Sequence, residues 1–316
     1  MLLHAETKFT ARNTSIHRVI TGAGKVILGK DRQIRLAAAC LLARGHLLIE
    51  DLPGVGKTTL AHTLAKLLGL EFQRISFTSD LLPADIIGVS VFERETSQFR
   101  FHPGPIFAQL ILADEINRAT PKTQSALLEA MEEHQVTAEG ETRPLPEPFF
   151  VIATQNPSHQ VGTFPLPESQ LDRFLMRIEL GYPDRDAERA LLQGTERRNL
   201  VATLAPCLEP GELLELQASA NQVHAASALL DYIQAIVEHT RHAPEFANGL
   251  SPRAALGILH AAKAWAMLEG RDKVLPEDVQ AILPGVAGHR LAPAHEGARK
   301  RSAEITAALI EAVPIP

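Results

Sequence analysis

The chain has 316 residues, of which 45% are hydrophobic and 22% are charged. At about 150 residues per domain this suffices for two folded units with sizeable cores, and the composition excludes a disordered, fibrous or coiled-coil protein. The 31 Lys and Arg residues are outnumbered by 37 Asp and Glu residues, which gives a formal net charge of −6. Because a dedicated nucleic-acid binder carries a basic excess, a nucleic-acid partner is not expected.

Two features of the sequence bear on its compartment. The cysteines, Cys40 and Cys207, lie far apart and indicate neither a disulfide framework nor a thiolate metal site. The first 13 residues are polar, and no apolar run approaches the roughly 20 residues that span a bilayer. We therefore expect a cytoplasmic protein without membrane insertion.

In chain order, the first half of the sequence predicts strands that alternate with helices. Five short apolar runs are typical of strands buried on both faces of a parallel sheet. These runs are residues 46–50, 72–77, 110–114, 149–154 and 176–180. Helical periodicity lies between them, over residues 34–44, 58–68 and 123–134. The alternation predicts a doubly wound α/β domain, which we place at residues 1–183.

After residue 183 the pattern contains no further strand. Helical periodicity covers most of the remaining chain, over residues 186–199, 211–223, 227–242, 252–269, 276–283 and 297–313. Pro252 and Pro276 stand at the starts of two of these helices, where the missing N–H of proline costs little. Residues 184–316 are therefore predicted to form an all-α second domain.

Two segments of the first domain interrupt this alternation and predict β-hairpins. Their strands cover residues 89–94 and 99–101 in the first hairpin and 135–138 and 141–145 in the second. Such hairpins either pad the edge of the core or form insertions with a role of their own. The sequence leaves both alternatives open.

A phosphate-binding loop follows the first predicted strand. Residues 51–59 read Asp-Leu-Pro-Gly-Val-Gly-Lys-Thr-Thr and lead directly into a predicted helix. In such a loop, backbone N–H groups converge on phosphate oxygens and the helix N-terminus adds positive potential, while Lys57 reaches the outer phosphates and Thr58 ligates magnesium. The residues of the predicted nucleotide site are Pro53, Gly54, Val55, Gly56, Lys57, Thr58 and Thr59.

Asp51 departs from this motif, which has glycine at its first position. Aspartate tolerates left-handed backbone angles better than most residues, so we expect the turn to survive the replacement. Gly54 and Gly56, which allow phosphate to approach the backbone closely, are both present. Nucleotide binding is therefore still expected.

Polar residues end the next two strands of the predicted sheet. Asp114 would face the nucleotide crevice and hold Mg²⁺, and the adjoining Glu115 can orient and deprotonate an attacking water. Acidic pairs also cap helices. Asn156 follows the fourth strand, and its amide can bind both the attacking water and a γ-phosphate oxygen, although Asn before Pro is also a common turn opener.

Two arginines are candidates for a role between subunits. Arg173 precedes the fifth predicted strand, and Arg253 opens a helix of the second domain. An arginine that reaches a γ-phosphate from a neighbouring subunit can raise the rate by about 10³ to 10⁵. Catalysis would then depend on assembly. Either arginine can instead form an ordinary surface ion pair.

Taken together, these motifs resemble those of the AAA+ ATPases, and among them those of the MoxR type. The resemblance rests on residues 50–59, 77–88, 113–133, 153–157, 162–175 and 251–254. The matching segments are dense between residues 28 and 183, sparser afterwards, and collinear throughout.

The resemblance implies a nucleotide site between an α/β core and an α-helical lid, in a ring that is usually hexameric. By matched position it assigns ATP and magnesium to Lys57, Thr58, Asp114 and Glu115, the first sensor to Asn156, the arginine finger to Arg173, the second sensor to Arg253, and an adenine contact to Leu28 and Gly29. Residues 26–29 can equally be a helix end.

The resemblance also implies partners. Members of this family are chaperone-like proteins that mature or activate other protein complexes, often with a partner that carries a von Willebrand factor A domain. The two hairpins resemble insertions shared with magnesium-chelatase subunits and replicative helicases. The sequence contains no aromatic–hydrophobic–glycine pore loop, so processive threading of a polypeptide is not expected.

We therefore expect a Mg²⁺-dependent ATPase that assembles into a ring and remodels or activates a partner protein. The ATPase subunit of a metal chelatase is the alternative, followed by a nucleic-acid motor and by a binding module that does not hydrolyse nucleotide. Glu139 and Glu141 at the tip of the second hairpin disfavour the motor. The intact pair of Asp114 and Glu115 disfavours the binding module.

Overall fold

The computed structural model describes residues 2–157, 162–194, 197–292, 294 and 302–315, with side chains from residue 14 onward except 197 and 198. Its centre is a five-stranded sheet in the order β2-β5-β8-β1-β9, in which all neighbouring strands are parallel. The strands are β1 (Leu47–Glu50), β2 (Phe72–Ser76), β5 (Leu110–Asp114), β8 (Phe150–Gln155) and β9 (Met176–Ile178). The predicted fold class is confirmed, and each predicted strand boundary lies within two residues of the observed one.

The central strands are buried as their apolar runs predict, but the edge strand β2 is not. Every residue of β5 and β8 except the last is buried, because helices cover both faces at the centre of the sheet. In β2 only Ile75 is buried. The expectation that every strand is buried on both faces is therefore wrong for β2, which lies at the sheet edge and exposes Arg74.

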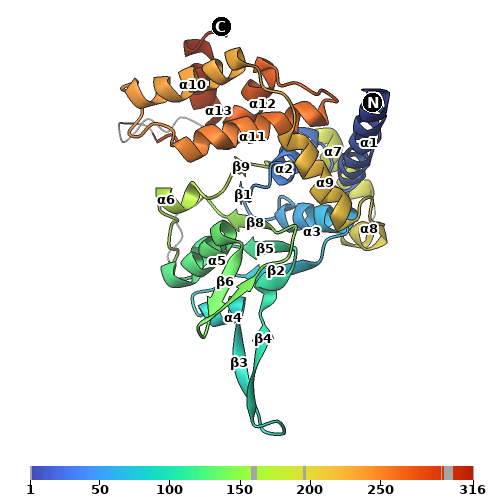
Figure 1. Cartoon of the computed structure of the whole chain (residues 1–316), viewed down its shortest axis with the longest axis vertical. Helices are drawn as coiled ribbons and strands as arrows, with labels where there is room; N and C mark the ends of the chain where they lie inside the picture. Colours follow the sequence, from blue (N-terminus) through green and yellow to red (C-terminus); the bar gives the residue numbers. More distant parts are fainter. Residues whose placement is uncertain (1, 158–161, 195–196, 293, 295–301, 316) are drawn as a thin grey trace.

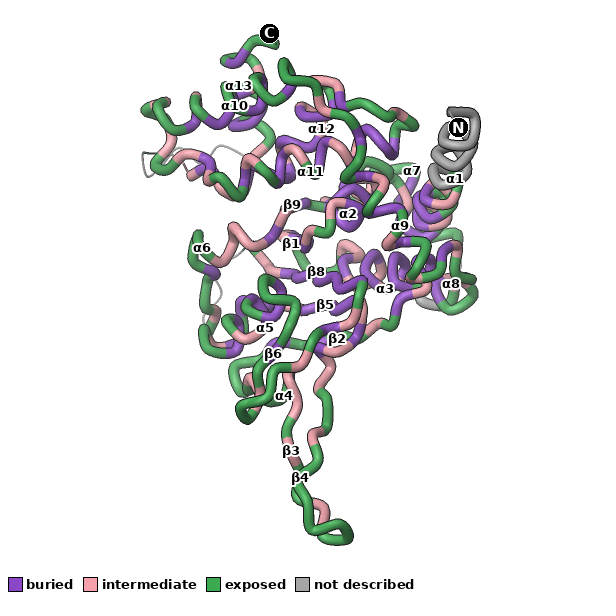
Figure 2. Tube along the Cα trace, in the orientation of Figure 1, coloured by how far each residue is buried: buried purple, intermediate pink, exposed green. Residues whose placement is uncertain are grey.

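Helices pack on both faces of the sheet, whose central strands are buried (Figure 2). The alternation of side chains along each strand divides the core into two apolar clusters. Leu47 and Ile49 of β1 belong to one apolar cluster, whereas Leu48 between them belongs to the other. The first face is covered by α2 (Asp31–Leu42) and α3 (Lys57–Leu67), on which α1 (Leu2–Val26) packs in turn. The second apolar cluster includes residues of α4 (Pro83–Ile87) and α5 (Pro121–Glu133).

The predicted elements include no helix before residue 34, so α1 corrects the sequence-based assignment. Ile16, Val19, Ile20 and Ala23 of this helix are buried in the first cluster. Their spacing of three and four residues is the helical period. The polar residues that precede them obscured this period in the sequence.

Both predicted hairpins are present: β3 (Gly88–Glu93) pairs with β4 (Gln98–Pro103), and β6 (Gln135–Ala138) pairs with β7 (Glu141–Pro144). The β3–β4 hairpin projects far from the body of the molecule (Figure 1), so it does not pad the edge of the core. At its base the Ser90 backbone N–H donates to the Glu139 carboxylate at 3.3 Å, and the Arg143 guanidinium lies 3.8 Å from the centre of the Phe101 ring. The acidic tip of the second hairpin is therefore partly engaged by the first.

Beyond β9 the described chain is helical, and α10 to α13 lie at the top of the view in Figure 1. The helices are α7 (Arg185–Gln193), α8 (Arg197–Thr203), α9 (Pro210–Asn221), α10 (Ser227–His242), α11 (Pro252–Leu268), α12 (Pro276–Ala287) and α13 (Ser302–Ala312). Helix α12 packs against β9, and α9 and α11 pack against α2. No helix among the described residues is long and apolar enough to cross a membrane.

Two predicted helices in this region differ from the observed ones. The single helix expected over 186–199 is wrong, because Gly194 adopts an extended conformation that ends α7 before α8 begins. Helix α12 continues through Pro284 to Ala287 instead of ending at residue 283. The start of the helix expected over 297–313 lies outside the described residues, and α13 is described from Ser302.

Candidate functional site

The loop between β1 and α3 has the backbone that a phosphate-binding loop requires. Gly54 and Gly56 have φ angles of 84° and 96°, in the left-handed region that favours glycine, and Gly56 directly precedes the first turn of α3. A Cβ added at either glycine would meet no atom within 4 Å. Packing therefore does not demand glycine here. The backbone conformation does, and it leaves open space beside the N–H groups at the start of α3.

Asp51 does not adopt the left-handed angles that its place in the motif led us to expect. The residue is only 8% exposed, and its carboxylate accepts three backbone hydrogen bonds. Oδ1 accepts from the N–H of Leu52 at 2.7 Å, and Oδ2 accepts from the N–H groups of Leu180 and Gly181 at 2.6 Å each. The left-handed angles are therefore not the reason for an aspartate here, and its carboxylate instead connects the loop residue Leu52 to the residues that follow β9.

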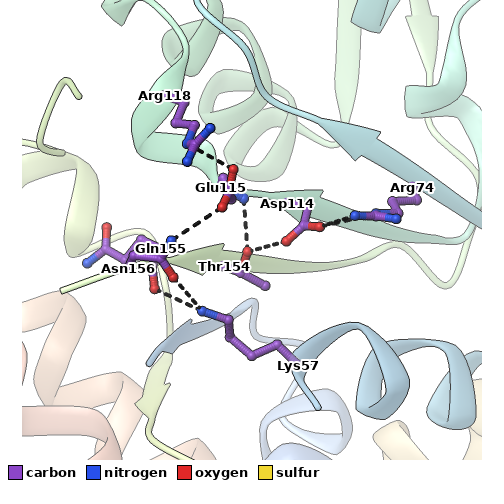
Figure 3. Close-up of polar contacts among 8 residues, drawn as sticks. All are labelled: Lys57, Arg74, Asp114, Glu115, Arg118, Thr154, Gln155 and Asn156. Atoms are coloured by element: carbon purple, nitrogen blue, oxygen red, sulfur yellow. Dashed lines mark hydrogen bonds and ion pairs between the residues drawn. The ribbon is translucent and has the colours of Figure 1, made fainter. Parts of the chain in front are cut away.

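Lys57 is the first residue of α3, and its ammonium group lies close to Gln155 and Asn156 at the end of β8 (Figure 3). It donates to the carbonyl oxygen of Asp51 at 2.5 Å, to Oδ1 of Asn156 at 2.9 Å and to the carbonyl oxygen of Gln155 at 3.4 Å. Burial lowers the pKa of Lys57, and nearby carboxylates, with Asp51 first among them, oppose this shift. The lysine is therefore held by neutral oxygens that phosphate oxygens can replace.

Asp114 ends β5, and both of its oxygens have partners. The buried Thr154 hydroxyl donates to Oδ1 at 2.6 Å, while Arg74 donates to Oδ2 from Nε at 3.1 Å and from a terminal nitrogen at 2.5 Å. Thr154 Oγ1 also accepts from the backbone N–H of Glu115 at 2.9 Å. One hydroxyl therefore fixes two consecutive acidic residues relative to β8.

Glu115 has a φ of 57°, which turns the chain sharply after β5. Its Oε1 accepts from Asn156 Nδ2 at 3.3 Å, and its Oε2 forms an ion pair with Arg118 Nε at 2.9 Å. Asn156 therefore contacts Lys57 with its amide oxygen and Glu115 with its amide nitrogen (Figure 3). The structure brings together four predicted site residues: Lys57, Asp114, Glu115 and Asn156.

The two predicted arginines lie elsewhere, and they lie together. Arg173 forms an ion pair with Oε2 of Glu132 at 2.9 Å, and Arg253 pairs with Oε1 of the same carboxylate. They line a cavity of about 180 Å³ that also includes Arg44 and His46. His46 precedes β1, whereas Lys57 follows the loop after β1. The arginines therefore lie at the amino end of β1 and the lysine lies beyond its carboxyl end.

Comparison with known proteins identifies the family. Residues 46–176 match the model of the ATPase family associated with various cellular activities (AAA), and residues 238–309 match that of the AAA lid domain. The chain is 42% identical to Chaperone MoxR1 of Mycobacterium tuberculosis over 88% of this chain and 75% of that protein, and 35% identical to Protein MoxR of Paracoccus denitrificans over 92% and 93%. The chain belongs to the MoxR family of AAA ATPases.

Two solved structures bear on the fold of this MoxR-family ATPase. A candidate ATPase from Cytophaga hutchinsonii is 37% identical and superposes with a TM-score of 0.92, covering 100% of this chain and 99% of that one. A full-length MCM homologue from Methanopyrus kandleri has a TM-score of 0.60 at 18% identity, over 98% of this chain and 62% of that one. The second likeness concerns the fold alone. The family and the first structure establish a nucleotide-binding ATPase.

Leu28 and Gly29 lie next to the start of the helical region of this MoxR-family protein. Helix α1 ends at Val26, so the segment is a helix end, one of the two alternatives that its sequence allowed. A Cβ added at Gly29 would lie 3.2 Å from the side chains of both Ala187 and Asp184. The segment thus packs against the first turn of α7, while the adenine contact stays a prediction.

Arg74, Arg118 and Thr154 are polar residues of the site that the motifs did not predict. Arg74 is a charged residue in the middle of a predicted strand. Its position in the sequence could have indicated a polar partner near the site. Thr154 carried no such signal, because a threonine at the end of an apolar strand is common. Its role appears only when β5 and β8 lie side by side.

Proposed function

We propose that this MoxR-family ATPase hydrolyses ATP with Mg²⁺ at the carboxyl ends of β1, β5 and β8, and that a ring of copies uses the reaction to remodel or activate a partner protein. The observation that carries the proposal is the contact between Asn156 and both Lys57 and Glu115. A residue of this kind links the group that binds phosphate to the group that activates water.

The phosphate loop supplies the binding half of the proposal. The N–H after Gly54 lies in the loop and the N–H after Gly56 is the first of α3, whose dipole favours negative charge at this end. Lys57 would exchange its present oxygen partners for the outer phosphates of ATP. The proposed nucleotide contacts are Pro53, Gly54, Val55, Gly56, Lys57, Thr58 and Thr59, with Leu28 and Gly29 at the adenine.

The donor set at this place fits magnesium. Thr58 is the second residue of α3, directly after the loop, and Asp114 ends β5 at the same edge of the sheet. They supply a hydroxyl and a carboxylate oxygen, both hard ligands that Mg²⁺ prefers. We propose that these two residues hold the ion. When bound, it neutralises charge on the outer phosphates. The Thr154 hydroxyl keeps Asp114 in place throughout.

Glu115 is the proposed general base. It adjoins Asp114, and its Oε1 accepts from the Asn156 amide. A water that replaces this direct contact could bind both side chains and pass its proton to the carboxylate. Arg118 pairs with the other oxygen and orients the group. Asn156 would then hold the attacking water and a γ-phosphate oxygen at once.

The position of Arg173 and Arg253 supports a ring. Four residues of β1, about 13 Å of extended chain, separate the arginines at its amino end from the phosphate loop at its carboxyl end, which is more than an arginine side chain spans. We propose that both act on the nucleotide of a neighbouring copy. A contact between unlike faces gives a ring when the rotation from copy to copy closes, and the family resemblance implies a ring of six.

We propose that residues 1–183 are the nucleotide-binding core and residues 184–316 the lid. Strand β9 ends at Ile178, every described element from Arg185 onward is helical, and the match to the lid family lies at residues 238–309. Arg253 of the lid and Arg173 of the core share Glu132, so a movement of the lid would change the position of Arg253 relative to Arg173 and Glu132.

The client is proposed to be a protein. A relative at 42% identity is named a chaperone, and the chain carries a net charge of −6, which disfavours a nucleic-acid client. A partner with a von Willebrand factor A domain, which the family resemblance implies, belongs to the same proposal. The projecting β3–β4 hairpin exposes Phe92 and Phe99, which offer an apolar surface to a protein.

Glu115→Gln tests the proposed function. The variant should bind fluorescent ATP with unchanged affinity, because the amide keeps the shape of the side chain, and should release phosphate at least about 100-fold more slowly, because it cannot accept a proton. The control Glu133→Gln removes an exposed carboxylate of α5 and should keep the wild-type rate. Unchanged turnover in Glu115→Gln would remove Glu115 from the role of base.

A further inference from the structure

Asp51 is a buried carboxylate inside the phosphate loop, where the motif has glycine. It is 8% exposed, and its two oxygens accept from the N–H groups of Leu52, Leu180 and Gly181 at 2.6 to 2.7 Å. Three short hydrogen bonds from main-chain donors to one carboxylate make a fixed, charge-assisted contact. The side chain therefore ties its own loop to another segment of the chain.

That segment is the connection from the sheet to the helical region. Leu180 is buried, Gly181 has a φ of 66°, and α7 begins at Arg185, so the chain turns at the residues that Asp51 holds. The next carbonyl, that of Tyr182, accepts from Lys30 Nζ at 2.7 Å. Residues 180–182 are thus hydrogen-bonded both to Asp51 of the phosphate loop and to Lys30, which lies in the segment after α1.

A carboxylate at this place has an electrostatic cost in a protein that binds a polyphosphate. The phosphate loop attracts anions through N–H groups and Lys57, and a negative charge in the same loop weakens that attraction. Glycine, the residue of the motif, would avoid this cost. Glycine, however, has no side chain to accept from Leu180 and Gly181. The charge of Asp51 also favours the protonated form of Lys57, but Asp114, Glu115 and Glu50 act in the same direction, so this effect does not require an aspartate in the loop.

We propose that Asp51 is a positioning residue that couples the phosphate loop to the lid. When nucleotide binds or leaves, the loop moves, and Asp51 carries this movement directly to residues 180–181, which lead into the first helix of the lid. The aspartate thus lowers the affinity for nucleotide and gives the lid a fixed link to the state of the loop. This proposal rests on nucleotide binding at the phosphate loop.

Asp51→Gly, which restores the glycine of the motif, is the decisive variant. It should bind ATP as tightly as the wild type or up to about tenfold more tightly, since a negative charge has been removed. Its kcat should nevertheless fall at least about tenfold, since the lid no longer follows the loop. In hydrogen exchange, the amides of Leu180 and Gly181 should lose protection at least about tenfold without nucleotide, because their acceptor is gone.

Two further variants keep the test decisive. Asp51→Asn replaces the glycine variant if that variant does not fold. Asparagine has one acceptor oxygen in place of two, so the same changes in kcat and amide exchange are expected, but smaller. Glu50→Gln removes a neighbouring carboxylate that pairs with Arg177 at 2.7 Å instead of with the connection. Glu50→Gln should leave the exchange of the Leu180 and Gly181 amides unchanged. This control distinguishes the loss of the Asp51 hydrogen bonds from the loss of a negative charge near the loop.

Three results would overturn the proposal: wild-type kcat in Asp51→Gly, unchanged exchange at residues 180–181, or a loss of ATP affinity in parallel with kcat. The last would show a loop that has merely lost its shape. If the wild type itself hydrolyses no ATP, the proposed function fails. The exchange and affinity measurements still decide the link between loop and lid in that case.

Discussion

At the scale of single residues, Asp114 and Glu115 are held in place by side chains to which we assign no catalytic role. Thr154 donates to Asp114 and accepts from the Glu115 N–H, so one buried hydroxyl sets the spacing of the two acids. Arg74 covers the remaining oxygen of Asp114. The two acidic residues therefore have fixed positions before any nucleotide arrives, which is the condition for efficient electrostatic catalysis.

Thr154→Val should damage both stability and turnover. Valine keeps the shape of the side chain but leaves the Glu115 N–H and Asp114 Oδ1 without this partner, at a cost of about 1–3 kcal/mol per unpaired buried group. We expect a lower urea midpoint and at least a tenfold slower release of phosphate. Thr154→Ser, which keeps the hydroxyl, should restore most of both. Equal behaviour of the two variants would mean that the hydroxyl does not position the acids.

The convergence of the motif residues could be predicted because the carboxyl ends of parallel strands meet at one edge of a sheet. This reasoning placed Asp114 and Asn156 near Lys57, as the structure has them. It could not find the contact of Arg74 with Asp114, which depends on the register of β2 against β5. Nor could it find that Asp51 faces the end of β9, because a carboxylate can replace glycine for reasons other than backbone angle.

At the scale of elements, a buried histidine joins three of them. His46 precedes β1, accepts from the Val151 N–H of β8 at Nδ1 over 3.0 Å, and donates from Nε2 to the Met131 carbonyl of α5 over 3.1 Å. Both ring nitrogens are used as a neutral imidazole uses them. Burial lowers the pKa of His46 to about 4, the bond to Met131 opposes the shift, and the nearby His134 adds to it.

This histidine predicts a pH dependence of stability. Between about pH 6.5 and pH 4 the unfolded chain takes up a proton at His46 that the folded chain does not, so stability is full above pH 6.5 and falls by up to about 3 kcal/mol as the pH drops to 4. His289, whose pKa burial also lowers, acts in the same direction. Urea midpoints across this range measure the effect.

A variant that cannot titrate isolates the contribution of His46. His46→Gln should be less stable at pH 7.5, yet its midpoint should vary less between pH 6.5 and 4, with the remaining slope owed to His289 and to carboxylates. An unchanged slope would mean that His46 takes up its proton in the folded protein over the same pH range as in the unfolded chain. That result would contradict its role as a neutral link between β8 and α5.

Elements with strong local signals were predictable, and elements that depend on their neighbours were not. The hairpins have turn residues between alternating strands, and both occur where expected. Helix α1 carries its apolar period in its second half alone, so its polar beginning concealed it. The break between α7 and α8 rests on one glycine in an extended conformation, and a periodic pattern does not reveal such a break.

At the scale of the whole molecule, the proposed site is divided between two faces. Lys57, Asp114, Glu115 and Asn156 lie at the carboxyl end of the sheet, while Arg173 and Arg253 share Glu132 beside the amino end of β1. No pattern in the sequence predicts that the two arginines are neighbours, because their contact depends on how the lid packs on the core. A single copy thus holds a cationic cluster that its own phosphate loop does not use.

Mixing two inactive variants tests the central claim most directly. Lys57→Ala lacks a working phosphate loop but keeps its arginines, and Arg173→Ala keeps its loop but lacks one proposed trans-acting cation. Each alone should hydrolyse ATP at least about 100-fold more slowly than the wild type. In an equimolar ring with random order, about one site in four pairs an intact loop with an intact arginine, so the mixture should regain about a quarter of wild-type activity. A mixture no more active than the sum of its parts would contradict a site shared between copies.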